Sequence, residues 1–260
     1  MIPYPGGKAG SGVCHKIINL MPPHEVYIEP FLGGGAVMLA KRPARRNIGC
    51  DLVPSALQAV SAALGESGDI AGGCVAIADR LSLDLAGRAR GIAQFDFHQG
   101  DGMEFLRRYP FTGRELVYAD PPYLLSARSD CTRDIYHHEM TDHQHRDLLK
   151  LLRGLRCMVM ISGYASHLYD SFLEGWHVTT FQAMTRRGPA TEWLWCNFAP
   201  PVELHDYRYL GKDYREREKI RRQKQRWVAR LERMPALQRQ ALLSAIASID
   251  ISSEGARANG

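Results

Sequence analysis

The sequence predicts an α/β domain built on a largely parallel sheet, and three observations lead to this prediction. Short apolar runs alternate with segments of helical periodicity along most of the chain. The first run enters a glycine-rich turn at 29–35, and the second ends in an acid, Asp51. Two alternating segments on either side of residues 185–189 predict a hairpin that closes the sheet. A strand, a glycine turn, a helix and an acid-terminated strand are typical of the opening of a Rossmann-like fold.

Composition and cysteine usage exclude several other classes of protein. The 260 residues are 45% hydrophobic and 23% charged, which is typical of a globular chain. No apolar run reaches the roughly 18 residues of a membrane span, and the N-terminus lacks the pattern of a signal peptide. The six cysteines form no C-x-x-C pair, so neither a disulfide framework nor a cysteine zinc site is predicted. We expect a cytoplasmic protein with no membrane or metal partner.

The first half of the sheet is expected between residues 13 and 63. Apolar residues at helical spacing predict helices, and Pro22-Pro23 ends the first of them. In chain order the expected elements are helix 13–20, strand 26–28, helix 36–41, strand 47–51 and helix 54–63. Residues 65–95 are rich in glycine and alanine and receive no assignment.

The second half begins with a strand at 95–98 and its terminal loop. Thr141 and Gln144 have the spacing of a capping box, which predicts a helix that runs on to Gly154. The other expected elements are strand 115–119, loop 124–140, strand 157–162, helix 165–173 and the hairpin strands 178–184 and 192–198.

The composition changes after Pro200-Pro201. Between Arg208 and Arg233 the chain has eleven Lys or Arg against four acids, a local balance of +7, whereas the whole chain carries only +5. Basic charge concentrated in one stretch indicates a polyanionic partner, and a solvated helix of alternating charge is the alternative. We expect a catalytic domain at 1–202 and a basic helical extension at 203–260.

The tetrad Asp120-Pro121-Pro122-Tyr123 directly follows the expected strand 115–119. Ligands of open α/β sheets bind at the carboxyl ends of the strands. Because proline has a fixed φ and no N–H, the carbonyl groups of Asp120 and Pro121 are held outward without a competing local donor. One carboxylate and one carbonyl suit an NH2 group, and Tyr123 offers a face for a planar base. A proline-stiffened turn capped by an acid is the alternative.

The turn Glu29-Pro30-Phe31-Leu32-Gly33-Gly34-Gly35 is the second candidate. Its glycines permit a close approach to the backbone, but their spacing is not that of a pyrophosphate-binding G-x-G-x-x-G loop. Asp51 lies where the acid of a Rossmann-type domain binds ribose hydroxyl groups. A nucleoside cofactor without phosphates is therefore predicted, which points to S-adenosylmethionine.

Two weaker candidates lie elsewhere in the chain. Lys8 of the N-terminal turn 4–8 is a candidate cation for the methionine carboxylate of this cofactor, with Tyr4 packed beside it. A glycine turn with a solvated lysine is the alternative. Asp101 follows strand 95–98 and is either an acceptor for the adenine amine or a helix cap.

These motifs, in this order, resemble those of the Dam-type DNA adenine-N6 methyltransferases. The order is YPGGK, EPFLGGG, a strand-terminal acid and DPPY, and the stretches 141–149 and 192–198 resemble the family's next helix and closing strand. The resemblance covers roughly residues 3–200. It implies an S-adenosylmethionine-dependent methyltransferase sheet with a C-terminal hairpin, to which this chain adds the basic extension.

The resemblance also implies an activity and a site. The activity is site-specific methyl transfer to N6 of a flipped adenine in double-stranded DNA, with a link to restriction-modification. Glu29 and Asp101 are added to the implied cofactor site because of their positions in the candidate turns and strand ends described above. The expected cofactor site is then Tyr4, Lys8, Glu29, Phe31, Gly33, Gly35, Asp51, Asp101 and Asp120. The expected catalytic residues are Asp120, Pro121, Pro122 and Tyr123.

The chain departs from the family in the segment that reads DNA. Only about 43 residues separate Asp51 from Phe95, so the expected target-recognition segment, 55–95, is shorter than in the GATC-reading members. Basic residues elsewhere are therefore candidate DNA contacts, with solvated surface charges as the alternative. They are Arg128, Arg133, Arg186, Arg187, Lys212 and Arg215.

Other interpretations stay open on the sequence alone. The tetrad also fits methylation of cytosine N4 or of an RNA base, and a catalytically silent nucleic-acid-binding relative is a further alternative. Segment 236–249 predicts an amphipathic helix that packs on the core or on a second copy, which would make a homodimer. The histidines at 137, 138, 143 and 145 lack the four-residue step of a helical metal site.

Overall fold

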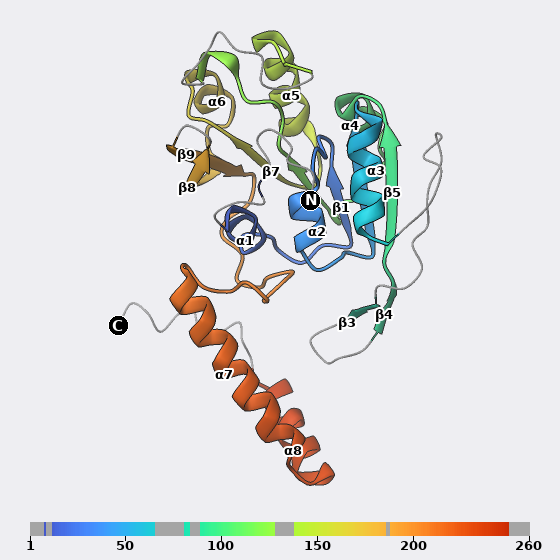
Figure 1. Ribbon diagram of the computed structural model, residues 1–260, viewed down its shortest axis with the longest axis vertical. Coiled ribbons are helices and arrows are strands. Elements are labelled where there is room, and N and C mark those ends of the chain that lie inside the picture. Colours follow the sequence, from blue (N-terminus) through green and yellow to red (C-terminus); the bar gives the residue numbers. More distant parts are fainter. Residues whose placement is uncertain are drawn as a thin grey trace. The chain divides into compact units, whose positions relative to one another are not determined.

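The computed structural model describes residue 8 and residues 12–65, 81–83, 89–127, 138–185 and 188–249. The chain divides into two compact units, Met1–Tyr209 and Leu210–Gly260 (Figure 1). The first unit holds the sheet, and the second contains two helices.

The sheet of the first unit has seven strands in the order β5-β2-β1-β6-β7-β9-β8. The strands are β1 (Val26–Glu29), β2 (Arg46–Asp51), β5 (Gln94–Gln99), β6 (Glu115–Ala119), β7 (Met158–Gly163), β8 (His177–Thr185) and β9 (Gly188–Cys196). Strands β1, β2, β5, β6 and β7 are parallel, whereas β9 is antiparallel to both β7 and β8. A separate pair joins β3 (Leu81–Leu83) to β4 (Ala89–Ile92). The predicted Rossmann-like fold with a closing hairpin is confirmed.

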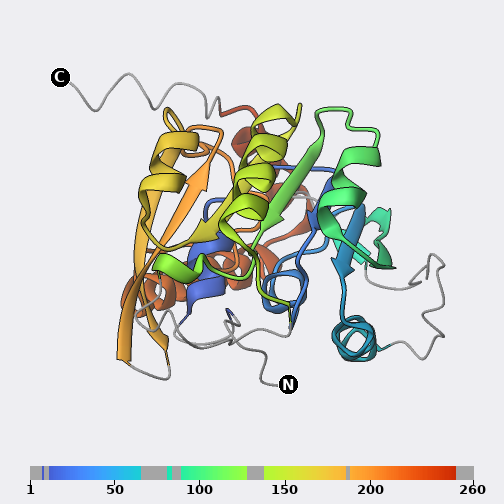
Figure 2. The ribbon, with the colours of Figure 1, turned by 90° about the horizontal axis from the view of Figure 1, so that it is seen from above.

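Helices cover both faces of this sheet (Figure 2). They are α1 (Val13–Ile18), α2 (Ala36–Ala40), α3 (Pro54–Ala63), α4 (Gly102–Arg108), α5 (Asp142–Gly154) and α6 (His167–Phe172), with a 3-10 turn at Leu125–Ala127. Apolar residues of α1, α2 and α3 share one core cluster, and those of α4, α5 and α6 share the other. Neighbours on β6 alternate between them, since Tyr118 belongs to the first cluster and Val117 to the second. Both faces of the strands are therefore buried, as in parallel sheets generally.

Most expected elements lie where the sequence placed them. The bounds of α3 and β6 agree with expectation, and the Thr141–Gln144 capping box is present. Helix α4 follows the terminal loop expected after the strand at 95–98 and confirms the alternative that Asp101 is a helix cap. The side chain of Asp101 accepts hydrogen bonds from the N–H groups of Met103 and Glu104 and so begins this helix.

The division between the units lies after Tyr209, beyond the boundary expected at 202. Side chains just before it bind the sheet unit. His205 Nε2 lies 3.0 Å from the carbonyl oxygen of Arg42, and Asp206 accepts the Arg42 N–H at 2.7 Å. The ring of Tyr209 stacks on His15 at a centroid distance of 4.0 Å. The change in composition comes before the structural division. The charge pattern of the sequence does not show that residues 205–209 contact the sheet unit.

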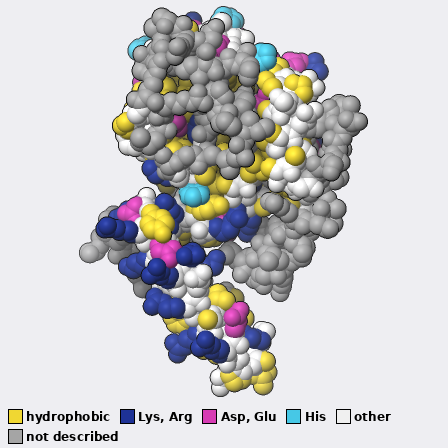
Figure 3. Space-filling model, viewed as in Figure 1, with side chains coloured by type: hydrophobic (Ala, Val, Ile, Leu, Met, Phe, Trp, Pro, Cys, Tyr) yellow, Lys and Arg dark blue, Asp and Glu magenta, His cyan; other side chains and the backbone are white. Residues whose placement is uncertain are grey.

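The second unit contains α7 (Tyr214–Glu232) and α8 (Ala236–Ala247), neither of which has a buried residue. Lys and Arg side chains gather along α7 (Figure 3). Leu237 and Ile246 of α8 are both exposed, and nine residues place them on opposite sides of a helix. The expected amphipathic stripe is therefore absent from α8. No helix in the described ranges combines the length and apolar character needed to cross a membrane.

Gly102 begins α4 in close contact with the turn after β1. A Cβ at this position would lie 1.9 Å from the carbonyl oxygen of Pro30, so Gly102→Ala must displace one of the two segments. We expect this overpacking to lower the free energy of unfolding by about 1–3 kcal/mol in urea titrations. Gly154→Ala is the matched control, because a Cβ there meets nothing within 4 Å. Equal stability of the two variants would contradict the close approach.

Candidate active site

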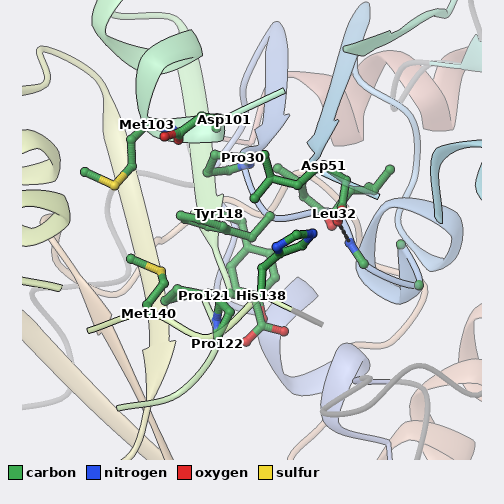
Figure 4. A pocket seen from close by; sticks show the side chains of 18 of the residues that line it. Pro30, Leu32, Asp51, Asp101, Met103, Tyr118, Pro121, Pro122, His138 and Met140 are labelled. Carbon is green, nitrogen blue, oxygen red and sulfur yellow. Dashed lines mark hydrogen bonds between the residues drawn. The ribbon is translucent and has the colours of Figure 1, made fainter. Parts of the chain in front are cut away.

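The carboxyl ends of four parallel strands open into one cavity (Figure 4). Its volume is about 430 Å³, which is within the range of small-molecule sites. Glu29 ends β1, Asp51 ends β2, Asp101 follows β5 and Asp120 follows β6, and all four line the cavity. Strands β1 and β6 are neighbours in the sheet although β2 and β5 lie between them in the chain. The cavity thus occupies the topological switch point, where open α/β sheets bind ligands.

Asp51 holds the glycine-rich turn in its conformation. Its Oδ2 accepts the N–H of Gly33 at 2.7 Å, and its Oδ1 accepts the N–H of Val53 at 2.8 Å. Gly35 has a φ of 59°, which disfavours any residue with a side chain. A Cβ there would also lie only 2.7 Å from Val60 Cγ2, so the space is lacking as well. A carboxylate has about four acceptor positions, so Asp51 retains capacity for a ligand's hydroxyl groups.

Glu29 is buried at the end of β1 and lines the cavity. Its Oε1 accepts a hydrogen bond from the hydroxyl of Tyr27 at 2.7 Å. Burial is the main cause that raises the pKa of Glu29 to about 8, and the hydrogen bond from Tyr27 opposes it. The carboxyl group is therefore mostly protonated at pH 7, and a protonated carboxyl can donate as well as accept.

The ammonium of Lys8 is paired with the carboxylate of Asp120. Its Nζ is 2.8 Å from both carboxylate oxygens of Asp120 and 3.8 Å from Oε2 of Glu192. It also lies 4.8 Å from the centroid of the Tyr123 ring. The Lys8 side chain is 4% exposed, so this ammonium is held in a nearly closed environment of two acids and one ring. Lys8 also lines the cavity, and its expected contact with a cofactor carboxylate stays a prediction.

The Tyr123 ring is also less accessible than the sequence predicted. It is 4% exposed, with the Tyr164 ring at a centroid distance of 4.7 Å and an interplanar angle of 73°. In this conformation Lys8 and Tyr164 pack against the ring, and stacking of a base on it stays a prediction. Sequence patterns indicate the type of side chain but not which neighbours cover it.

Several cavity residues were not anticipated. They are Leu52, Met103, Tyr118, His138, Glu139, Met140 and Gln144. The side chain of His138 projects into the cavity from the segment before α5 (Figure 4). Tyr118 is buried on β6, and its hydroxyl lies 2.8 Å from Ser162 Oγ. They lie on a strand, on the helices α4 and α5 or in loops, and nothing in the sequence indicates that they line a cavity, although Gln144 was recognised as part of a capping box.

The remaining candidates divide into three groups. Tyr4, Arg128, Arg133, Arg186, Arg187 and much of the 55–95 segment lie outside the described residues. Lys212 is exposed just before α7, and Arg215 is exposed in its first turn. His145 is buried, with Nδ1 at 3.1 Å from the Tyr169 hydroxyl. Across the described part of the chain, no group of three or more His, Cys, Asp or Glu side chains is placed to hold a metal ion.

Comparisons with known proteins give only distant likenesses. No family model and no curated protein matches the chain. It is similar to a precorrin 8W decarboxylase of Methanobacterium thermoautotrophicum, with 14% identity over 76% of this chain and 100% of the other, at a TM-score of 0.43. An rRNA methylase of Streptococcus thermophilus has 13% identity, 75% and 97% coverage and a TM-score of 0.42. TrmK of M. capricolum, bound to S-adenosyl-homocysteine, has 10% identity, 92% and 95% coverage and a TM-score of 0.41. The fold is therefore assigned from this chain's own strand order and register.

The buried proton of Glu29 gives a pH-dependent stability. Because the pKa rises from 4.5 to about 8 on folding, the folded chain keeps a proton that the unfolded chain loses between these values. The stability of the wild type relative to Glu29→Gln should fall by at least about 1 kcal/mol from pH 5 to pH 8, measured by urea unfolding. Glu25→Gln is the control, since Glu25 is exposed and should follow the wild type. A constant difference between wild type and Glu29→Gln across this range would exclude the buried proton.

Proposed function

We propose that this chain is an S-adenosylmethionine-dependent methyltransferase that acts on N6 of adenine in double-stranded DNA. The position of Asp120-Pro121-Pro122 is the observation that carries the proposal. These residues leave β6 at the switch point and line the cavity that Asp51 and the glycine turn also line. An acid, a fixed carbonyl group and a nucleoside-sized cavity thus lie together.

The charge of the cavity supports this cofactor over a phosphorylated one. Its lining contains five acids, of which Glu29 is mostly protonated, and the only Lys or Arg among the described lining residues is Lys8. The ammonium of Lys8 is engaged by Asp120. An acidic cavity repels phosphate and attracts a cation, and S-adenosylmethionine is a sulfonium cation without phosphates.

The residues present also match the parts of this cofactor. Asp51 and Asp101 both line the cavity, and Asp101 also caps α4. Asp51 is the proposed acceptor for ribose hydroxyl groups, and Asp101 is the proposed acceptor for the adenine amine. The turn at 33–35 presents backbone without side chains. When bound, the cofactor supplies an electrophilic methyl group.

Asp120 and the carbonyl group of Pro121 are the proposed acceptors for the target amine. The amine of adenine is a poor nucleophile because its lone pair is delocalised into the ring. Two acceptors on its hydrogens favour tetrahedral geometry at nitrogen, and they stabilise the positive charge that develops there. Asp120 need not remove a proton first, since the amine becomes acidic only as it is alkylated.

A base in duplex DNA reaches these acceptors only outside the stack. Extrusion costs a few kcal/mol, and stacking on an aromatic ring offsets part of that cost. Tyr123 is the proposed ring, which requires that Lys8 leaves the position it holds over it.

The second unit provides a surface suited to a nucleic-acid backbone. Steps of four, three and four residues along α7 place four basic side chains on one face of the helix. They are Arg215, Lys219, Arg222 and Arg226. We call this set the basic stripe. Opposite it lie Arg217, Arg221 and Lys224.

The activity is tested by incubating the chain with labelled S-adenosylmethionine and unmethylated plasmid DNA, then identifying the methylated nucleoside by mass spectrometry. We expect N6-methyladenine from the wild type. We expect a rate at least about 100-fold lower from Asp120→Asn, because the variant lacks the negative charge that stabilises the positive charge developing on the amine. Cofactor binding by calorimetry should persist in this variant. Asp170→Asn, an exposed change on α6, is the control.

Each other product has a definite meaning. Formation of N4-methylcytosine would show that the substrate base is cytosine and not adenine. Label found in RNA alone would show that the substrate is RNA and not DNA. Full activity of Asp120→Asn would refute the role of the tetrad. Cofactor binding without transfer to any nucleic acid would indicate a silent relative.

The basic stripe predicts a face-specific salt dependence. Neutralising Arg215, Lys219 and Arg222 to Gln should reduce the slope of log Kd against log salt, by up to about 0.9 for each phosphate that the protein no longer neutralises. The control neutralises Arg217, Arg221 and Lys224 on the opposite face and removes the same net charge. Slopes are measured by fluorescence anisotropy with duplex DNA. Equal slopes for the two triple variants would exclude a role for this particular face.

A further inference from the structure

Glu192 is a buried carboxylate next to the candidate site, and the function proposed above gives it no role. It is 6% exposed, and its Oε2 lies 3.8 Å from the Nζ of Lys8. A buried charge is costly unless it is paired. Its position therefore calls for a partner, and Lys8 is the cation that faces it.

The closing hairpin brings this carboxylate to the edge where Asp120 lies. Strand β9 pairs with β7 as far as Trp193, which is opposite Gly163 at the carboxyl end of β7. Glu192 is one residue beyond this pair and is opposite Phe181 of β8. Because β9 is antiparallel to β7, its first residues extend past the carboxyl ends of the parallel strands. Glu192 is thus positioned by the strand register.

The surroundings of Glu192 couple it to Lys8. Burial is the largest influence and raises its pKa, and the charge of Lys8 is the next largest and lowers it. The charge of Asp120 raises the pKa, and a hydrogen bond with Tyr123 lowers it. The net effect is a raised pKa, and the ammonium that Glu192 shares with Asp120 is the largest influence that favours its anion.

Lys8 occupies the position that a target base requires. Its ammonium contacts both oxygens of Asp120 and lies over the ring of Tyr123. A cation at this distance from the target amine would oppose the positive charge that develops on nitrogen. Moving the ammonium into bulk solvent would leave Glu192 without its cation. Moving away from Asp120 and across the 3.8 Å that now separates it from Glu192 Oε2 would instead give the ammonium a direct contact with that acid.

We propose that Glu192 is a positioning residue, which takes over the ammonium of Lys8 when the target base enters and so releases Asp120 and Tyr123 to hold that base. This role rests on the proposed methyl transfer. It requires a side-chain movement and no proton transfer, and the net charge of the three side chains is unchanged. The recipient is an amine-bearing planar base, whose NH2 group replaces the ammonium as the donor to Asp120.

Glu192→Gln tests this role while it keeps the size of the side chain and an oxygen for Tyr123. We expect kcat/KM for DNA to fall at least about tenfold, because Lys8 then stays on Asp120, whereas the KM for S-adenosylmethionine is unchanged. Glu192→Asp retains a carboxylate and should restore most of the activity. Glu174→Gln, at an exposed site after α6, is the matched control.

A second comparison separates positioning from structural support. If Glu192 acts through Lys8, Glu192→Gln should have little effect on kcat/KM in a Lys8→Met background, where no ammonium blocks Asp120. An equal loss in both backgrounds, or no rescue by Glu192→Asp, would overturn the role. Normal transfer by Glu192→Gln would remove this role alone and leave the proposed function intact. Absence of transfer by the wild type would remove the proposed function, and this role with it.

Discussion

The ion pair between Lys8 and Asp120 is the interaction on which the site depends. It joins residues 112 positions apart, and so holds Lys8 at the carboxyl edge of the sheet. Lys8 is almost fully buried and Asp120 is partly exposed, so removing Asp120 would leave a buried ammonium with less compensation. The carbonyl oxygen of Lys8 also accepts the N–H of Cys14 at the start of α1. The pair therefore connects the first helix, the central strand β6 and the cavity.

The electrostatics of the cavity follow from the same pair. Four neighbouring strand ends deliver acids to one place, and mutual repulsion would be severe if all were ionised. Two arrangements reduce it. Burial keeps Glu29 mostly protonated, and Lys8 neutralises Asp120. Asp51 has both oxygens bound by backbone N–H groups, which stabilise its charge. The acids thus coexist because each has a different kind of compensation.

The sequence was sufficient for the fold because alternating periodicity, proline stops and the capping box are local signals. The extent of helix α4 was not assigned, although a cap at Asp101 was one alternative, because Gly100 and Gly102 on either side of Asp101 are typical of a loop. The strand-end acids were recognised because parallel topology alone brings them to one edge. Glu192 and His138 were not, since their proximity to Asp120 or to the cavity depends on the hairpin register and on the path of a loop. The packing of Lys8 and Tyr164 on the Tyr123 ring also depends on tertiary contacts that the sequence pattern does not show.

The burial of Tyr123 and the ion pair of Asp120 are compatible with base binding, because a base can form its own counterpart of each contact that the Lys8 ammonium now makes. An NH2 group donates hydrogen bonds to Asp120 as the ammonium does, and a stacked base covers the ring that the cation now faces. The one interaction that a neutral base cannot replace is the charge of Lys8. Glu192 is the buried acid within reach that can receive this charge, and so the closing hairpin and the N-terminal segment act on the same step.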